Sequence, residues 1–222
     1  MAFIELENVT KTFHAGDEDY PAVRGVSLGI GSGEFVAVMG PSGSGKSTLL
    51  SLIGGLSHAS AGIVSVDGID LGALGPNRLS DFRREYLGFV FQSFYLVPYL
   101  NAVENVMLPL TIQPGMNGKA RDSALEALRK VGLDAKAHRL PSQLSGGEQE
   151  RVAIARAIVN RPPVILADEP TGNLDTRTGD HVLDMLQELH REGRTIVMVT
   201  HNGENAKRAG RTIEIRDGQV AG

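Results

Sequence analysis

The chain of 222 residues is long enough to bury a sizeable core, either as one large domain or as a core with a subdomain. Hydrophobic residues make up 41% of it and charged residues 22%, ordinary values for a globular protein that exclude a disordered or fibrous chain. With 22 basic against 26 acidic residues, no basic run and no cysteine, the sequence argues against a nucleic-acid partner and excludes disulfides and thiolate metal sites.

The first third of the chain alternates β-like runs with turn signals, which predicts a small, partly antiparallel sheet. The polar residues 14–20 are expected to form a simple hairpin connection within it. Residues 35–40 (FVAVMG) are almost continuously apolar, as in a parallel strand covered on both faces. They lead through glycine-rich sequence into the helical spacing of residues 46–56, so a strand, a loop and a helix follow one another.

Further along, short strand patterns occupy residues 62–68 and 87–92, after which the spacing becomes helical. The expected helical runs of this middle block are 101–110, 119–132 and 147–160. Alternation of strand and helix then returns, with strands expected at 163–170, 195–201 and 211–220, a helix at 176–191 and a short helix after residue 201. No secretory signal and no apolar run of about 18 residues is visible, so we expect a cytoplasmic protein.

Residues 40–47 match the phosphate-loop pattern G-x-x-x-x-G-K-[ST] in full, between an expected buried strand and an expected helix. Glycines allow the tight turn that aims backbone N–H groups at a phosphate, and the helix adds its positive end. Lys46 would reach the β- and γ-phosphates, Ser47 would bind Mg²⁺, and Thr48 would contact the α-phosphate side. The alternative is a surface turn with a chance lysine. The residues expected to contact the nucleotide here are Gly40, Pro41, Ser42, Gly43, Ser44, Gly45, Lys46, Ser47 and Thr48.

Two carboxylates, Asp168 and Glu169, follow the apolar run VILA. Ligands of α/β proteins bind beyond the carboxyl ends of the strands, so both side chains are placed for chemistry. Asp168 would hold Mg²⁺ through water, and Glu169 would deprotonate the attacking water. Taken alone, the pair could equally be two acids at a solvated strand exit.

A second glycine-rich stretch, LSGGE at residues 144–148, begins an expected helix, with Ser145 as its N-cap. The exposed N–H groups of Ser145, Gly146 and Gly147 would form another anion site. One chain therefore carries two such loops, although one nucleotide needs only one.

The motifs together resemble the nucleotide-binding subunit of ATP-binding cassette transporters, in the order typical of that family. Besides the phosphate loop, LSGGE and the carboxylate pair, the matching positions are Phe13 (adenine stacking), Gln92 (lid glutamine), Asp175 (the dimer-facing loop) and His201 (the switch histidine). The resemblance implies a RecA-like P-loop core of α/β class with an antiparallel β subdomain and an inserted α-helical subdomain. Within a single domain of residues 1–222, it places the core at 1–92 and 160–222 and the helical subdomain at 93–159.

The resemblance also implies partners and roles. ATP and Mg²⁺ would be sandwiched between two copies arranged head to tail, so that Ser145, Gly146, Gly147, Glu148 and Asp175 of one copy close over the nucleotide of the other. Catalytic residues would be Glu169, His201 and Lys46, and metal ligands Ser47, Gln92 and Asp168. A membrane subunit would contact Ser93–Leu100, holding the chain at the cytoplasmic face of the inner membrane. Within the family, the chain is similar to the macrolide-export, lipoprotein-release and haem-export group.

Several departures leave alternatives open. Phe13 stands where tyrosine is commoner, and Tyr20 is an alternative stacking residue. Glu148 and Glu150 replace frequent glutamines and would add negative charge near an anionic ligand. The aromatics Phe94, Tyr95 and Tyr99 could serve either core packing or partner binding. A non-transport relative acting in DNA repair or on ribosomes is the rival function, and a small-molecule kinase would leave LSGGE and His201 without a role.

Overall fold

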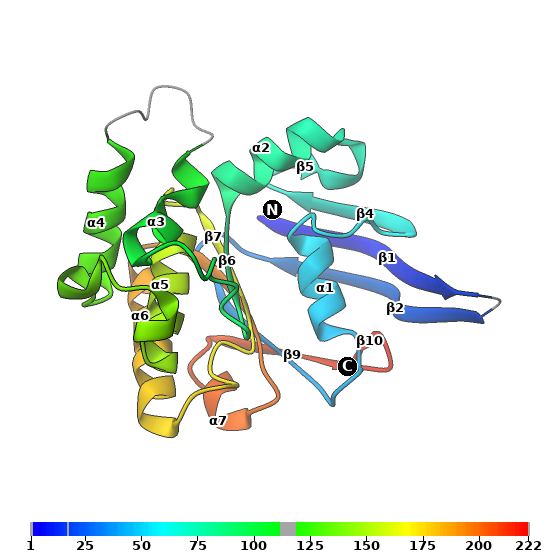
Figure 1. Ribbon diagram of the computed structural model, residues 1–222. Coiled ribbons are helices and arrows are strands. Elements are labelled where there is room, and N and C mark those ends of the chain that lie inside the picture. Colours follow the sequence, from blue (N-terminus) through cyan, green and yellow to red (C-terminus); the bar gives the residue numbers. More distant parts are fainter. Residues whose placement is uncertain (1, 17, 112–118, 222) are drawn as a thin grey trace. The chain divides into compact units, whose positions relative to one another are not determined.

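The computed structural model describes residues 2–16, 18–111 and 119–221 (Figure 1). The chain forms two compact units. One comprises the described residues up to Arg83 and from His190 onward, and the other is Arg84–Leu189. Among the described residues, no helix combines the length and the apolar character needed to cross a bilayer.

The first unit contains an antiparallel sheet with strand order β2-β1-β4-β5. Its strands are β1 (Ile4–Ala15), β2 (Glu18–Ile30), β4 (Ala61–Val66) and β5 (Ile69–Asp70), followed by the 3₁₀ turn η1 (Leu71–Ala73). This confirms the antiparallel sheet predicted from the first third of the chain.

The hairpin expected at residues 14–20 is confirmed, but its connection is shorter than predicted, because β1 continues to Ala15 and β2 begins at Glu18. His14 pairs with Asp19 across the hairpin, and Phe13 pairs with Tyr20. His14 Nδ1 and Asp19 Oδ1 lie 2.5 Å apart and form an ion pair. Both side chains are exposed, although the backbone that carries them is extended. Asp17 lies outside the described residues.

The same unit holds four further strands in the order β10-β9-β3-β8. They are β3 (Phe35–Met39), β8 (Thr195–Val199), β9 (Arg211–Arg216) and β10 (Gln219–Ala221). β3 pairs parallel with both β8 and β9, and every residue of β8 is buried, as its apolar run requires. The carboxyl ends of these strands therefore lie at one edge, where α1 (Lys46–Ile53) and α7 (Gly203–Ala206) begin shortly after β3 and β8.

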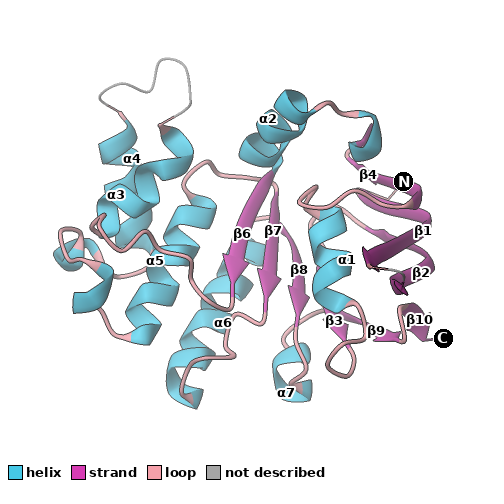
Figure 2. Ribbon diagram, turned by 45° about the vertical axis from the view of Figure 1, so that its right-hand side comes forward, coloured by secondary structure: helices cyan, strands magenta, loops and turns pink. Residues whose placement is uncertain are grey.

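The second unit contains two parallel strands, β6 (Leu87–Phe91) and β7 (Val164–Asp168), which Figure 2 shows side by side. Its helices are α3 (Ala102–Met107), α4 (Ala120–Lys130), α5 (Gly146–Ile158) and α6 (Thr176–Arg191), with 3₁₀ turns at Leu108–Leu110, Asp134–Lys136 and Pro141–Gln143. Residues 112–118 of the predicted helical subdomain lie outside the described residues, and its boundaries at 93 and 159 stay a prediction.

One helix was not expected from the sequence. α2 (Pro76–Tyr86) begins at a proline, which suits the first turn of a helix because its missing N–H would have no intrahelical partner there. Only Leu79 and Phe82 of this helix are buried. Its apolar periodicity is therefore too weak to indicate a helix by pattern alone.

Candidate active site

The phosphate loop follows β3 and ends where α1 begins, as its sequence predicts. Two of its glycines are required by close approach of other backbone. A Cβ on Gly40 would lie 2.0 Å from the carbonyl oxygen of Ile215, and a Cβ on Gly45 would lie 2.2 Å from that of Ala22. Gly45 is also the N-cap of α1, with a φ of 100° that L side chains rarely adopt. The loop is therefore held closely between β9 and β2.

The loop has the electrostatics of an anion cradle. Lys46 is 7% exposed, and its Nζ donates to the carbonyl oxygen of Pro41 at 2.8 Å. The hydroxyl of Ser44 is buried and has no hydrogen-bond partner among the described residues. α1 has no side-chain cap and no acidic residue in its first turn. A phosphate group fits this set of donors, because it would supply acceptors to the N–H groups, the ammonium and the buried hydroxyl.

A cavity of about 700 Å³ brings His201 together with the start of the phosphate loop. Its lining is Met39, Gly40, Pro41, His201, Thr212, Glu214 and Arg216. His201 lies just beyond β8 and Gly40 just beyond β3, and these two strands pair in parallel, which explains the juxtaposition. The first unit thus places the predicted switch histidine and the phosphate loop at one strand edge.

Three residues of that cavity were missed by the sequence reasoning: Thr212, Glu214 and Arg216. They alternate along β9 with the buried Ile213 and Ile215, so these three polar residues share one face of the strand. Arg216 donates to Glu214 Oε1 at 2.7 Å, an exposed ion pair at the cavity wall. The sequence shows the alternation of polar and apolar residues in this strand, but it does not show that the polar residues line this cavity.

The second unit brings Gln92, Asp168 and Glu169 to the ends of neighbouring strands. Phe91 of β6 pairs with Asp168 of β7, so Gln92 and Glu169 each occupy the first position beyond their strand. The side-chain amide of Asn173 donates to the backbone oxygen of Gln92 at 2.8 Å and ties the two strand exits together. Glu169 has a φ of 47°, an uncommon conformation for a residue other than glycine and one that is concentrated at functional sites.

Ser145 is the N-cap of α5, as predicted. Its hydroxyl accepts the N–H of Glu148, and the Glu148 carboxylate accepts the N–H of Ser145 at 2.9 Å, forming a complete capping box. Glu148 also forms an ion pair with Lys136. The hydrogen bond from Lys136, followed by the one from the Ser145 backbone, holds the pKa of Glu148 below its usual range.

Gly147 and Asp175 meet at one residue that the sequence reasoning missed, Thr178 of α6. A Cβ on Gly147 would lie 2.0 Å from Thr178 Cγ2, so a glycine is needed for this helix contact. Asp175 accepts the Thr178 hydroxyl at 2.6 Å and the Thr178 N–H at 3.1 Å, which lowers the pKa of its carboxyl. The predicted dimer-facing loop and the LSGGE stretch therefore pack together within this unit, while Ser145 and Gly146 stay exposed.

Hydrogen bonds from other segments hold the backbone of residues 93–100, but two aromatic side chains of this segment stay exposed. Arg156 of α5 donates to the carbonyl oxygens of Phe94 and Tyr95, at 2.6 Å each. The buried side chain of Asn105, also missed in the sequence, bonds to the backbone of Val97 and Leu100. Tyr95 is 66% exposed and Tyr99 is 88% exposed, so core packing does not explain these two rings.

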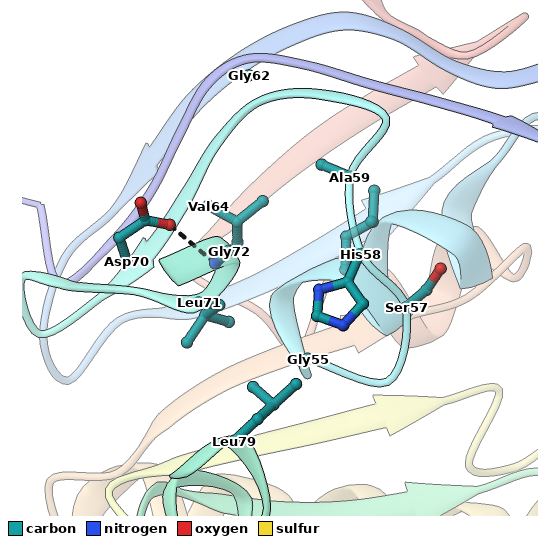
Figure 3. A pocket seen from close by; sticks show the side chains of 11 residues that line it. Gly55, Ser57, His58, Ala59, Gly62, Val64, Asp70, Leu71, Gly72 and Leu79 are labelled. Carbon is teal, nitrogen blue, oxygen red and sulfur yellow. Dashed lines mark hydrogen bonds between the residues drawn. The ribbon is translucent and has the colours of Figure 1, made fainter. Parts of the chain in front are cut away.

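A second hollow, of about 290 Å³, lies at the C-terminal end of α1, away from the phosphate loop. Figure 3 shows the residues that line it. Leucines 52, 71 and 79 line it together with His58 and Asp70, whose carboxylate accepts the N–H of Gly72 at 2.8 Å. None of the residues predicted to bind nucleotide lines this hollow.

Comparison with known proteins agrees with this site. The ABC transporter family profile matches residues 23–172, and the chain belongs to that family. It is 47% identical to the uncharacterized ABC transporter ATP-binding protein YvrO of Bacillus subtilis, over 98% of this chain and 95% of the relative. It is also 47% identical to the macrolide export ATP-binding/permease protein MacB of Rhodopirellula baltica, over 98% of this chain but only 32% of that longer protein.

A comparison with solved structures supports the assignment of the fold. The dimeric post-hydrolysis state of the ATP-binding cassette MJ0796 bound to ADP and Pi matches with a TM-score of 0.92 and 46% identity, over 99% of this chain and 97% of that one. MJ0796 is an uncharacterized ABC transporter ATP-binding protein of Methanocaldococcus jannaschii. The chain is thus the ATP-binding subunit of an ABC transporter, and it is an ATPase. The predicted P-loop fold and function are confirmed.

Proposed function

We propose that this ATPase subunit powers an exporter for amphipathic or lipophilic compounds, with two copies closing head to tail on two ATP molecules at the cytoplasmic face of the inner membrane. The observation that carries the nucleotide chemistry is the phosphate loop, where Lys46 is held at the carbonyl of Pro41 and α1 begins without a side-chain cap. MacB combines an ATP-binding part with a permease and is named for macrolide export, which supports an export role for its shorter relative.

In this proposal the phosphate loop binds the β- and γ-phosphates, with Lys46 as the cation and backbone N–H groups as donors. Ser47, Gln92 and Asp168 would hold Mg²⁺, which would neutralise charge on these phosphates. Glu169 accepts the proton of the attacking water. His201 contacts the γ-phosphate and keeps the water and Glu169 in place, and Phe13 stacks on adenine. The uncommon backbone conformation of Glu169 (φ 47°) supports its assignment as the base.

The partner copy contributes through exposed groups at the start of α5. Ser145 and Gly146 are exposed, as a contact with a second copy requires, and Asp175 sits in the adjoining loop at the start of α6. The dimeric MJ0796 cassettes, bound in one case to ADP and Pi, support this assembly. Loss of the γ-phosphate on hydrolysis removes charge-assisted hydrogen bonds from both copies, which would open the pair.

A membrane subunit docks on Ser93–Leu100. Tyr95 and Tyr99 are exposed there, and aromatic side chains are enriched at the energetically important positions of interfaces. The carbonyls of Phe94 and Tyr95 are fixed by Arg156, so the surface is pre-organised for a partner.

The test is Glu169→Gln, which keeps the size of the side chain but removes the base. We expect ATP hydrolysis to slow by about 10²-fold or more while ATP binding persists, so that the variant accumulates as an ATP-bound dimer. Phosphate release and light scattering during size exclusion measure the two effects. Glu188→Gln, at an exposed position of α6, is the matched control and should hydrolyse ATP normally. Turnover of Glu169→Gln at the wild-type rate would show that Glu169 is not the base.

A further inference from the structure

Phe13 and Tyr20 are two exposed aromatic residues on the hairpin of β1 and β2, and Figure 1 shows this hairpin. They are direct partners across the two antiparallel strands, with exposed fractions of 46% and 51%. Partners of this kind project to the same face of a sheet with Cβ atoms about 5 Å apart. The hairpin therefore offers two neighbouring rings to solvent, where the sequence motif alone offered a choice between them.

Each ring is tethered by its own polar contact. The ammonium of Lys11 lies over Phe13, 5.0 Å from the ring centroid, and donates to the carbonyl oxygen of His58 at 2.9 Å. The hydroxyl of Tyr20 donates to the Glu18 carboxylate. A cation therefore lies over one face of Phe13 while 46% of the residue stays exposed, and the hydroxyl of Tyr20 already has its acceptor.

The backbone after Tyr20 is fastened to the phosphate loop. The carbonyl of Ala22 lies directly against Gly45, where an added Cβ would come within 2.2 Å of its oxygen. Arg24 N–H donates to Gly218 at 2.8 Å, and Gly218 N–H in turn donates to Ser44 at 3.0 Å. The aromatic pair thus begins two residues from the contact with the N-cap of α1, in the same unit as the phosphate loop.

We propose that Tyr20 is a second binding residue for the nucleobase, beside Phe13, so that the adenine site is a platform of two rings. This inference rests on the ATP-binding function. Aromatic rings stack on any base through its π-face, each contributing about 1–3 kcal/mol. Because the Tyr20 hydroxyl is engaged by Glu18, Tyr20 acts through its ring and not through a hydrogen bond to the base. Phe13 stacks through the face opposite Lys11.

The first experiment compares a ligand with a base and one without. ADP and inorganic pyrophosphate are titrated by calorimetry, because neither is hydrolysed by the ATPase reaction. Tyr20→Ala is expected to weaken ADP binding about 5- to 10-fold, at the lower end of the stacking range, and to leave pyrophosphate binding unchanged. Tyr20→Phe should bind both like the wild type. Leu56→Ala, which removes an apolar side chain that is 49% exposed outside the proposed base site, is the control and should also change nothing.

Two results would overturn the proposal: an unchanged ADP affinity in Tyr20→Ala, or equal loss of ADP and pyrophosphate, which would indicate damage to the phosphate loop. Failure of the wild type to bind ADP would instead contradict the ATP-binding function itself.

A second readout uses the absence of tryptophan from the sequence. Tyr20→Trp gives a protein with one indole at the position in question. ADP should change its emission and pyrophosphate should not, since only ADP carries a base. If the fluorescence of the indole did not change with ADP, or changed equally with both ligands, Tyr20 would be excluded from the base site. Phe13→Trp, measured in parallel, reports contact with the other ring.

Discussion

Two helices of this protein begin after glycine-rich loops, yet their first turns are built differently. α1 begins at Gly45 with no side-chain cap and no acidic residue in its first turn. α5 begins at Ser145, which forms a full capping box with Glu148. No side chain caps the first turn of α1, whereas the Ser145 side chain caps that of α5. Glycine content alone therefore does not indicate how open a helix end is.

The buried charges near the two helix starts differ as well. Lys46 in α1 already donates to the carbonyl of Pro41. Glu150 in α5 is fully buried, and both of its carboxylate oxygens lack a hydrogen-bond partner among the described residues. Burial raises the pKa of Glu150 to about 8, although the charge of Arg156 acts in the opposite direction. Lys46 is thus a buried cation with one acceptor, whereas burial favours the protonated form of Glu150.

The largest expected effect comes from Glu150→Gln. A carboxyl whose pKa is raised on folding binds more protons folded than unfolded, so its ionisation lowers stability as the pH rises from about 4.5 to about 8. At pH 7 the cost is about 3 kcal/mol, which the neutral glutamine avoids. We expect the wild-type melting temperature to fall between pH 5 and pH 8 and that of Glu150→Gln to fall less. Thermal scans across this range measure the difference, and parallel curves for the two proteins would contradict the raised pKa.

The next largest effect is a difference in the free energy of unfolding between alanine variants of two glycines in the phosphate loop. Gly45→Ala places a Cβ 2.2 Å from a backbone oxygen at a φ of 100°, so we expect a loss of more than about 2 kcal/mol in the free energy of unfolding. Gly43→Ala is the control, because Gly43 also has a positive φ, 78°, but open space around its Cα, and it should lose about 1–2 kcal/mol. Urea unfolding measures both. Equal losses would mean that the close approach of Ala22 does not constrain the loop.

The smallest effect concerns the cap of α5. Ser145→Ala removes the acceptor for the Glu148 N–H and should cost about 1 kcal/mol of stability. Ser142→Ala, at an exposed position just before it, should be nearly neutral. The same urea experiment compares them. If Ser145→Ala were as stable as the wild type, the capping box would contribute nothing and the contrast between the two helix starts would be lost.

The sequence predicted the phosphate loop, the strand ends that carry Asp168, Glu169 and His201, and the cap at Ser145, because these depend on local pattern and spacing. It did not predict contacts between distant segments. The fit of Gly147 against Thr178 and the pairing of Phe13 with Tyr20 depend on tertiary packing and on strand register, which no local pattern encodes.

Glu148 and Glu150, which stand where the family often has glutamine, also show that the sequence does not predict tertiary contacts. From the sequence, Glu148 and Glu150 were both extra charges near an anionic ligand. In the structure Glu148 is paired with Lys136, while Glu150 is buried. α5 is apolar over much of its circumference, so its periodicity could not tell which of its acids points inward.

Arg156 connects α5 to the segment that carries the exposed tyrosines. A helix of its 13 residues is about 20 Å long, with Ser145 at one end and the guanidinium that grips Phe94 and Tyr95 near the other. A rigid rod of that length turns a tilt of about 5° at its first turn into a shift of about 2 Å at its last. Because Arg156 holds the carbonyl of Tyr95, such a tilt of α5 would also move the backbone of this exposed tyrosine.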